Sequence, residues 1–394
     1  MADAILTLNV GSSSLKLALF GAGENAPRLT SRGEIEDIGS LPHFMARDAT
    51  GKVISDQHWS AAGGNFQSVF EKVIGWAEGH LGGNKLMAVG HRIVHGGPDH
   101  TRPELVTPEL LEVLDRLTPL APLHEPHNIA PIRAVAAARP DLPQVACFDT
   151  AFHHTMPLVA TRFALPREYE AQGVRRYGFH GLSYEYIAHR LREIAPDLAK
   201  ERVIVAHLGN GASLCAISGG RSVDTTMGFS ALDGLVMGTR PGTLDPGVIL
   251  YLQQGCGLTV KQVEDLLYRR SGLLGVSGGI ASDMRTLLAS TDVRAAEAVE
   301  LFAYRIGREA AALTNALGGL DGIVFTAGIG EHAAAIRTAV CVRLGWLGIE
   351  IDEEANARNA AVITMPTSRV EVRIIPTDEE QMIARHTLET IRPS

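Results

Sequence analysis

Four short loops of this sequence combine glycine with residues that bind anions. They lie at residues 9–16, 209–211, 272–279 and 328–332. Glycine lets backbone N–H groups approach an anion closely, because no side chain stands in the way. Several such loops in one chain favour a polyphosphate ligand. None of them matches the G-x-x-x-x-G-K-[ST] pattern of a P-loop.

The first loop brings together an amide, several hydroxyl groups and a cation. Asn9 opens it, Ser12 and Ser14 lie within it, and Lys16 closes it. An ammonium group beside backbone and hydroxyl donors suits phosphate oxygens. The alternative is a polar surface hairpin with a solvated lysine.

Two of the other loops match patterns from different enzyme classes. Residues 328–333 fit the G-x-G-x-x-[GA] dinucleotide fingerprint, and residues 275–279 fit the G-x-S-x-G nucleophile elbow. The fingerprint stands late in the chain and leaves the first loop unexplained, and the elbow lacks a preceding strand. A Rossmann dehydrogenase and a serine hydrolase are therefore disfavoured alternatives. Asp283 and Arg285 are candidates for contacts to a nucleotide, or the start of a surface helix.

Two arginines and two carboxylates stand where a site could use them. Arg92 and Arg240 are flanked by glycine, a setting in which a guanidinium can hold an anion through a bidentate fork, although a surface ion pair is the alternative. Asp149 ends an expected strand, at the edge where ligand sites of α/β sheets open, and could hold magnesium or orient a nucleophile. Glu379 is expected in the first turn of the last helix, where the helix dipole alone favours an acid.

The histidines offer one candidate for charge stabilisation and little support for zinc. His91 and His95 form H-x-x-x-H without the glutamate of a zincin motif, so a zinc site is disfavoured. His180 lies in a loop, residues 175–181, that also carries arginines, aromatic residues and glycine. Such a loop suits charge stabilisation, although a lone histidine is more often structural.

Composition limits the class of protein. The chain has 394 residues, 45% of them hydrophobic and 20% charged, which suits two or three globular domains of about 150 residues each. A net charge of −8 argues against nucleic acid or an anionic membrane as a partner. No apolar run approaches the roughly 18 residues of a membrane span, and no secretory signal is evident. We therefore expect a cytoplasmic protein.

The four cysteines are far apart and form no C-x-x-C pair. We therefore expect buried free thiols at Cys147, Cys215, Cys256 and Cys341.

The elements that must position these groups alternate between short strands and longer helices, which indicates an α/β protein. In the first half we expect strands at residues 4–10, 15–20 and 144–148. Helical spacing begins at residue 66, and Thr107 caps a second helix that ends at residue 117.

The second half starts in a similar way, so two related halves are expected. Its elements are strands at residues 202–208 and 212–217, a helix at 294–317, a strand at 322–325, a loop at 326–331 and a strand at 370–375. Thr377 and Glu380 form a capping box for a terminal helix. No linker separates the halves, so we expect two domains that share an extensive cleft.

Taken together, the loops resemble the acetate kinase (acetate/propionate kinase) family over essentially the whole chain. The motifs that carry the resemblance are at residues 9–16, 90–97, 121–124, 148–153, 175–181, 207–211, 237–240, 271–277 and 325–331. The resemblance implies the α/β fold of the actin and sugar-kinase ATPases (ribonuclease H-like), usually as a homodimer. Its two related domains are expected at residues 1–150, joined by 381–394, and at residues 151–380, the nucleotide-binding domain, with an active-site cleft between them. It also implies a kinase that moves phosphate reversibly, by direct in-line transfer, between ATP and acetate, giving acetyl phosphate and ADP.

The same resemblance assigns roles to individual residues. It implies that the catalytic residues are Asp149, His180 and Arg240, and that the substrate is bound by Arg92, Val94, Leu123 and Phe179. It implies that Asn9 and Glu379 support Mg²⁺, or Mn²⁺. Nucleotide contacts map onto Lys16, Ser12, Ser14, His207, Leu208, Gly209, Asn210, Gly211, Asp283, Met284, Arg285, Gly328, Ile329, Gly330, Glu331 and His332.

The sequence departs from the family pattern at several of these motifs. Tyr184 stands where the family has histidine, Pro241 where it has serine, and His332 where it has asparagine. The usual proline of the acyl pocket is Ala231, and the smaller side chain would admit propionate. Acetate is the expected substrate, and propionate or another short fatty acid is the alternative. An ATPase switch of the actin or heat-shock class is more remote, because it does not need Arg92 and Arg240.

Overall fold

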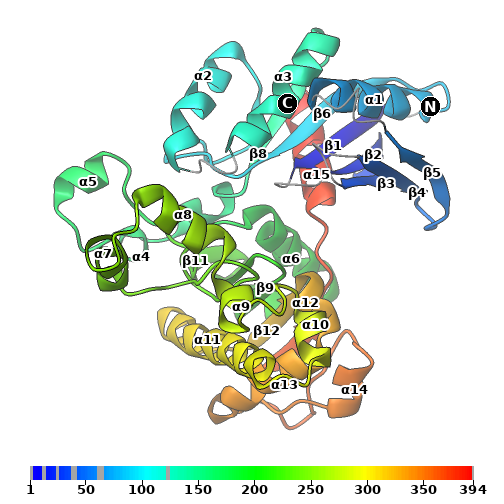
Figure 1. Cartoon of the computed structure of the whole chain (residues 1–394). Helices are drawn as coiled ribbons and strands as arrows, with labels where there is room; N and C mark the ends of the chain where they lie inside the picture. Colours follow the sequence, from blue (N-terminus) through cyan, green and yellow to red (C-terminus); the bar gives the residue numbers. More distant parts are fainter. Residues whose placement is uncertain are drawn as a thin grey trace. The chain divides into compact units, whose positions relative to one another are not determined.

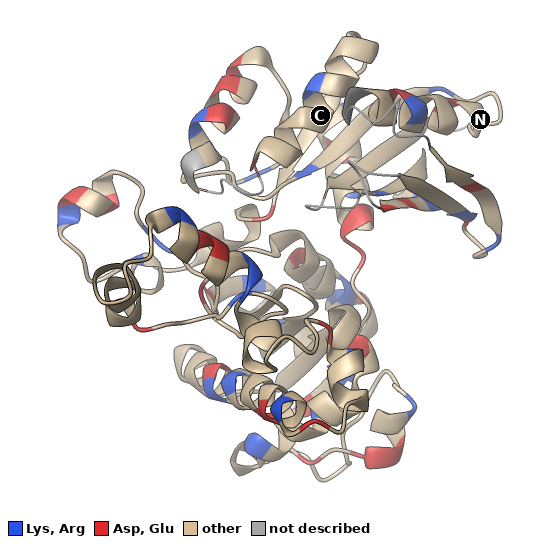
Figure 2. Ribbon diagram, viewed as in Figure 1, with Lys and Arg blue, Asp and Glu red and all other residues tan. Residues whose placement is uncertain are grey.

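The computed structural model describes residues 3–10, 15–23, 26–36, 42–59, 66–120 and 125–392 of the chain. The chain forms two compact units, Met1–Phe152 with Asp378–Ser394, and His153–Thr377. Each unit carries one β-sheet with helices packed on it (Figure 1). Lysine and arginine are interspersed with aspartate and glutamate in both units (Figure 2). Within the described ranges, no helix has the length and apolarity to cross a membrane.

The first unit is built on an eight-stranded sheet with the strand order β5-β4-β3-β2-β1-β6-β8-β7. Its strands are β1 (Ala4–Val10), β2 (Leu15–Ala22), β3 (Pro27–Glu36), β4 (His43–Asp48), β5 (Val53–His58), β6 (Leu86–Ile93), β7 (Glu104–Leu105) and β8 (Gln144–Phe148). Its helices are α1 (Phe66–Gly79), α2 (Pro108–Leu117), the 3-10 helix η2 (Thr118–Leu120), α3 (Glu125–Ala138) and α15 (Glu379–Ile391). The expected strands and the helix capped by Thr107 are confirmed.

The alternation of side chains along β1 decides which residue faces which helix. Leu6 and Leu8 join a hydrophobic core with residues of α1 and α3. On the opposite face, Ala384 of α15 packs against Ala18 of β2, and α15 also packs against β1, β6 and β8 (red in Figure 1). Asn9 therefore lies on the face that α15 covers.

Gly90 allows α15 to approach β6 closely. A Cβ at this position would lie 2.1 Å from Oγ1 of Thr387 and 2.6 Å from Cγ2 of Ile383. Both atoms belong to buried side chains that could not move aside easily. A larger residue at position 90 would push the last helix away from the sheet.

The second unit is built on a five-stranded sheet with the strand order β11-β10-β9-β12-β13. Its strands are β9 (Arg202–Leu208), β10 (Ala212–Ser218), β11 (Arg221–Thr225), β12 (Gly322–Thr326) and β13 (Glu371–Ile374). Its helices are η3 (Ala151–Thr155, which contains the boundary between the units), α4 (Leu158–Thr161), α5 (Arg167–Ala171), α6 (Gly181–Ile194), η4 (Leu198–Lys200), α7 (Pro246–Gln254), α8 (Val260–Arg269), α9 (Gly272–Val276), α10 (Met284–Ala289), α11 (Val293–Leu317), α12 (Ala327–His332), α13 (Ala334–Arg343), η5 (Gly345–Leu347) and α14 (Glu353–Ala357). The expected hairpin of β9 and β10 and the long helix α11 are confirmed.

Two local predictions are wrong. The capping box of Thr377 and Glu380 does not form, because Asp378 is the N-cap of α15 and accepts a hydrogen bond from the backbone N–H of Gln381. The loop expected at residues 326–331 is helix α12, which starts at Ala327 directly after β12. The chain makes this sharp turn because Ala327 adopts a left-handed backbone conformation, with φ of 63°.

The cysteines are free thiols, but not all of them are buried. Cys147, Cys215 and Cys341 are buried, as expected, whereas Cys256 is exposed. Cys256 follows α7, a helix with no buried residue. The G-x-S-x-G segment is also clarified, since residues 272–276 form helix α9 rather than a strand. The strand-to-helix turn that a nucleophile elbow requires does not precede Ser277.

Candidate functional site

The first unit gathers four of the expected site residues into one cluster. Asn9 lies at the end of β1, Arg92 at the end of β6, Asp149 directly after β8 and Glu379 at the start of α15. β1, β6 and β8 are parallel neighbours, so their carboxyl ends meet at one edge of the sheet. This is the edge at which α/β sheets bind ligands.

Arg92 is the centre of this cluster. Its Nε and Nη2 donate to Oδ2 of Asp149 at 2.9 and 2.5 Å, and its Nη1 donates to Oδ1 of Asn9 at 3.1 Å. The carboxylate of Glu379 lies 3.8 Å from Nε. Desolvation lowers the pKa of Arg92, but the carboxylates of Asp149 and Glu379 outweigh it and raise that pKa. The guanidinium is therefore permanently charged and balances the buried Asp149.

A second carboxylate of α15 joins the cluster. Nδ2 of Asn9 donates to Oε2 of Glu379 at 3.0 Å and to Oε1 of Glu380 at 3.1 Å. Burial and the adjacent Glu379 raise the pKa of Glu380, whereas the ammonium of Lys16 opposes that rise. Lys16 stands opposite Asn9 on β2. The sequence predicts Glu380 as part of a helix-capping box, so its place in this cluster is not predicted.

The donor atoms of this cluster fit a magnesium ion. Asn9 offers an amide oxygen, and Asp149, Glu379 and Glu380 offer carboxylate oxygens. Mg²⁺ prefers hard oxygen ligands and keeps several waters, so it needs only one or two of these groups. The same chemistry would accept Mn²⁺.

Asn128 of α3 holds the strand ends of the cluster in place, and sequence reasoning missed it. Its Oδ1 accepts a hydrogen bond from the backbone N–H of Val94 at 2.8 Å, and its Nδ2 donates to the carbonyl of Val10 at 3.4 Å. Oγ1 of Thr150 accepts from the backbone N–H of Gly96 at 3.0 Å. A single asparagine within a helical pattern gives no signal of such a role. Ser12, Ser14 and Leu123, which the sequence also nominated, lie outside the described residues.

The second unit contains a separate cluster around His180. This residue adopts a left-handed backbone with φ of 59° immediately before α6, which costs a non-glycine residue roughly 1–2 kcal/mol. Its Nδ1 lies 2.8 Å from Oγ of Ser213, which lies 2.5 Å from the hydroxyl of Tyr184. The ring also stacks on His207 with a centroid separation of 4.2 Å. The backbone strain and these contacts fix the position of the imidazole.

Arg240 and His180 converge over the α-carbon of Gly211. A Cβ built there would lie 2.8 Å from Nη2 of Arg240 and 3.3 Å from Nε2 of His180. Nη1 of Arg240 donates to the carbonyl of Ala231 at 2.7 Å. Desolvation lowers the pKa of Arg240 to about 10, so the guanidinium stays charged near neutral pH. Among the residues that the structure describes, Tyr268 and not a carboxylate is the group that opposes this fall in pKa.

Three loops of the second unit lie side by side next to this pair. The turn of Gly209 to Gly211 connects β9 and β10, and the carbonyl of Asn210 accepts from the backbone N–H of Gly238 at 3.0 Å. A Cβ on Gly238 would lie 2.0 Å from Oδ1 of Asn210 and 3.0 Å from the carbonyl of Ser282. Loops 209–211, 238–240 and 282–285 therefore lie in contact with one another.

The remaining nucleotide candidates differ in whether their side chains are exposed enough to contact a ligand. Leu208 and Met284 are buried, whereas Arg285 is exposed. Asp283 caps α10, and the backbone hydrogen bond from Thr286 lowers its pKa. Residues Gly328, Ile329, Gly330, Glu331 and His332 lie on α12, which follows β12, the parallel neighbour of β9.

Three of the expected positions contribute to the architecture of the loops. Phe179 is buried, and its carbonyl accepts from Nε2 of His153 at 3.0 Å. His207 lies at the end of β9, with its Nδ1 2.8 Å from Oγ of Ser183. The oxygen Oε1 of Glu331 accepts from the backbone N–H of Thr377 at 3.3 Å.

Comparisons with known proteins identify the family of this chain. The model of the Acetokinase family matches residues 4–385. An acetate kinase of Rhodopseudomonas palustris is 54% identical over 98% of this chain and 98% of its own length. A solved propionate kinase from Francisella tularensis has a TM-score of 0.92 at 37% identity, covering 99% of this chain and 100% of that chain. The acetate kinase of Porphyromonas gingivalis has a TM-score of 0.88 at 36% identity, with coverage of 99% and 100%.

Proposed function

This chain belongs to the acetokinase family, and from that premise we propose that it transfers the γ-phosphoryl group of ATP reversibly to acetate, giving acetyl phosphate and ADP. The observation that carries the mechanism is the convergence of Nη2 of Arg240 and Nε2 of His180 over Gly211. Two donors aimed at one point, one of them a cation, suit an incoming phosphoryl group.

The chemistry asks for positioning and charge stabilisation rather than for a strong base. Acetate is already an anion near pH 7, because carboxyl groups titrate near 4. Phosphoryl transfer involves little covalent chemistry for the protein, so donors placed at the equatorial oxygens dominate catalysis. Asn9, Glu379 and Glu380 would hold Mg²⁺. The ion would neutralise charge on the phosphate oxygens of ATP.

Arg92 has donors left to hold the acetate carboxylate. A guanidinium carries five N–H groups, and the contacts to Asp149 and Asn9 use three of them. One N–H remains on each terminal nitrogen, which is the arrangement of a bidentate fork. We assign this fork to acetate, next to the apolar Val94. Asp149 then acts by orienting Arg92 and, with the ion, the reacting groups.

Tyr184 and Ser213 lie where they can select the tautomer of His180, since Oγ of Ser213 is within hydrogen-bond distance of both the phenol and Nδ1. We propose that the phenol donates to Oγ of Ser213 and that the hydroxyl of Ser213 donates to Nδ1 of His180. The ring proton then lies on Nε2, the atom that approaches Gly211. A neutral histidine in this tautomer donates a hydrogen bond to a phosphoryl oxygen without repelling the nearby cation of Arg240.

The nucleotide is assigned to the loops beside this pair. Support comes from the adjacency of loops 209–211, 238–240 and 282–285 and from α12, which follows the strand next to β9. Backbone N–H groups of glycine-rich turns at such a sheet edge bind phosphates well. Leu208 and Met284 can take part only through their backbone, because their side chains are buried.

The proposal is tested by an assay that separates transfer from hydrolysis. The protein is incubated with ATP and Mg²⁺, with and without acetate, and both ADP and trapped acetyl hydroxamate are measured. We expect ADP formation to require acetate and to match the hydroxamate in amount. Hydrolysis of ATP without acetate, with no acyl phosphate formed, would instead indicate an ATPase switch.

Propionate is the second candidate substrate. Ala231 stands where the family has proline, and the structure resembles a propionate kinase from Francisella tularensis with a TM-score of 0.92. One methylene is worth only about 1–3 kcal/mol in an apolar pocket, so one smaller side chain can change the preference. Measuring kcat/KM for acetate, propionate and butyrate decides which acid is the preferred substrate. A kcat/KM for propionate above that for acetate would overturn our assignment.

The homodimer implied by the family is a further proposal, tested by light scattering.

A further inference from the structure

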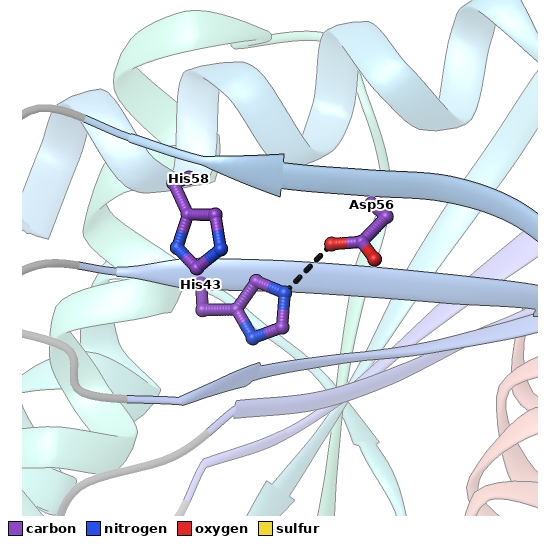
Figure 3. Close-up of side chains that lie close together, drawn as sticks. All are labelled: His43, Asp56 and His58. Atoms are coloured by element: carbon purple, nitrogen blue, oxygen red, sulfur yellow. Dashed lines mark hydrogen bonds and ion pairs between the residues drawn. The ribbon is translucent and has the colours of Figure 1, made fainter.

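Three potential metal ligands lie together on β4 and β5 of the first unit. They are His43, Asp56 and His58 (Figure 3). Each offers one ligand atom, and these atoms all lie within 4.8 Å of one another. We propose that they form a binding site for a divalent transition ion such as Zn²⁺, which the phosphoryl-transfer site does not use.

The register of the hairpin places the three side chains on one face. β4 and β5 are antiparallel, with His43 opposite His58 and Met45 opposite Asp56. Successive side chains of a strand point to opposite faces. Phe44 is buried in the core of the unit, so its neighbour His43 faces outward, and Asp56 and His58 share that outer face.

The ligand atoms lie close enough to bind one ion after a small rotation of a side chain. Nε2 of His43 donates to Oδ1 of Asp56 at 2.7 Å, and the rings of His43 and His58 stack at 4.2 Å with an interplanar angle of 9°. Zinc–nitrogen bonds are about 2.0–2.1 Å long. Because parallel rings direct their lone pairs along parallel planes, one ring must rotate to share an ion. Asp56 and His58 are exposed and His43 is only partly buried, so that rotation meets little resistance.

The donor set selects the class of ion. Two imidazoles and one carboxylate suit Zn²⁺, Ni²⁺ or Co²⁺, whereas Mg²⁺ and Ca²⁺ prefer oxygen ligands alone. Three protein ligands leave a position for water. Glu36 of β3 stands opposite His43 and adds negative charge to the same face. An ion there would replace the proton that His43 shares with Asp56.

Such an ion would link the two strands at the edge of the sheet. β5 is the outermost strand of the eight, next to β4, and the ligands come from both strands. An ion that binds only the folded hairpin stabilises it by RT ln(1 + c/Kd), where c is the free ion concentration, so the stabilisation grows with the logarithm of c once c exceeds Kd. The expected role is therefore stabilisation of this edge, with activity on acetate unchanged.

The experiment titrates the full-length protein with Zn²⁺, without nucleotide, by isothermal titration calorimetry. We expect one saturable site that is lost in His43→Asn and in His58→Asn. Losing a direct ligand should weaken binding by more than the roughly 10–100-fold that loss of an outer partner costs. His80→Asn is the matched control, because His80 is an exposed histidine of the same unit whose Nδ1 bonds the carbonyl of Trp76.

A second readout does not depend on the variants being folded. The Co²⁺-loaded wild-type protein should show visible absorption bands of a site with two nitrogen ligands, displaced by one equivalent of Zn²⁺. Equal Zn²⁺ affinity in wild type, His43→Asn and His58→Asn would overturn the proposal. An absorption spectrum equal to that of hydrated Co²⁺ would overturn it as well.

Discussion

Gly211→Ala tests whether the donors of Arg240 and His180 work through their position. The new Cβ would lie 2.8 Å from Nη2 of Arg240, whereas ordinary contacts begin at 3.4 Å, so the guanidinium must move by at least about 0.6 Å. Misplacement by about 1 Å can cost roughly 100-fold in rate. We therefore expect kcat to fall by about 10–100-fold.

The same substitution should leave the fold intact. Gly211 is not among the residues with positive φ, so alanine suits its backbone, and the nearest atom is the end of a flexible side chain. We expect the melting temperature by circular dichroism to stay within about 2 °C of wild type, because surface changes are usually within ±0.5 kcal/mol.

The assay measures acetate-dependent ADP formation by Gly211→Ala and by a matched glycine variant. Gly345→Ala is the control, because a Cβ at Gly345 meets nothing within 4 Å. The control should keep its kcat. A kcat of Gly211→Ala within twofold of wild type, with the protein folded, would refute the assignment of these donors to the phosphoryl group.

Four further substitutions give shorter tests. Arg240→Ala should lower kcat far more than it changes the Kd of ATP measured by calorimetry, and a near-wild-type kcat would exclude its role. Tyr184→Phe should lower kcat about 10-fold with KM for ATP unchanged, because Nε2 of His180 would no longer be the fixed site of the ring proton; an equal rise in KM would indicate a structural role instead. Glu380→Gln should raise the Mg²⁺ concentration needed for half-maximal rate, since it removes one oxygen charge from the cluster; an unchanged requirement would contradict that assignment. Burial raises the pKa of Glu125 from 4.5 to about 8, so the folded protein holds a proton that the unfolded chain loses, and stability should fall by up to about 1.4 kcal/mol per pH unit between these values. Glu125→Gln should remove that fall in urea unfolding series, and parallel curves for both proteins would disprove it.

The strands and the hairpins follow from the sequence because local patterning determines them. Two apolar runs on either side of a short glycine-containing turn mark β1 with β2 and β9 with β10. The same reasoning places Asp149 at a strand end. These features depend on residues that are close in the chain.

The start of the last helix shows where local patterns are insufficient. Thr377 and Asp378 both fit a capping pattern, with Glu380 and Gln381 three residues later. The choice of Asp378 moves Glu380 into the site beside Asn9. Local patterns do not distinguish the two starts, whereas the packing of α15 on β1 joins residues from opposite ends of the chain.

Other parts of the site depend on register and close approach. Gly211 resembles any turn glycine until Arg240 and His180 are placed next to it. His43 and His58 are fifteen positions apart, and only the pairing of β4 with β5 brings them together. The left-handed backbone of Ala327 could not be predicted from the sequence, because alanine rarely adopts that conformation.

In the proposed reaction, an oxygen of acetate attacks the γ-phosphorus of ATP. Acetate labelled with ¹⁸O in both carboxylate oxygens tests it directly, with ³¹P NMR of the product after one equivalent of ATP is consumed. We predict acetyl phosphate in which phosphorus is bonded to one ¹⁸O, seen as an upfield isotope shift. Unlabelled inorganic phosphate as the phosphorus product would show that water is the acceptor and would contradict the account.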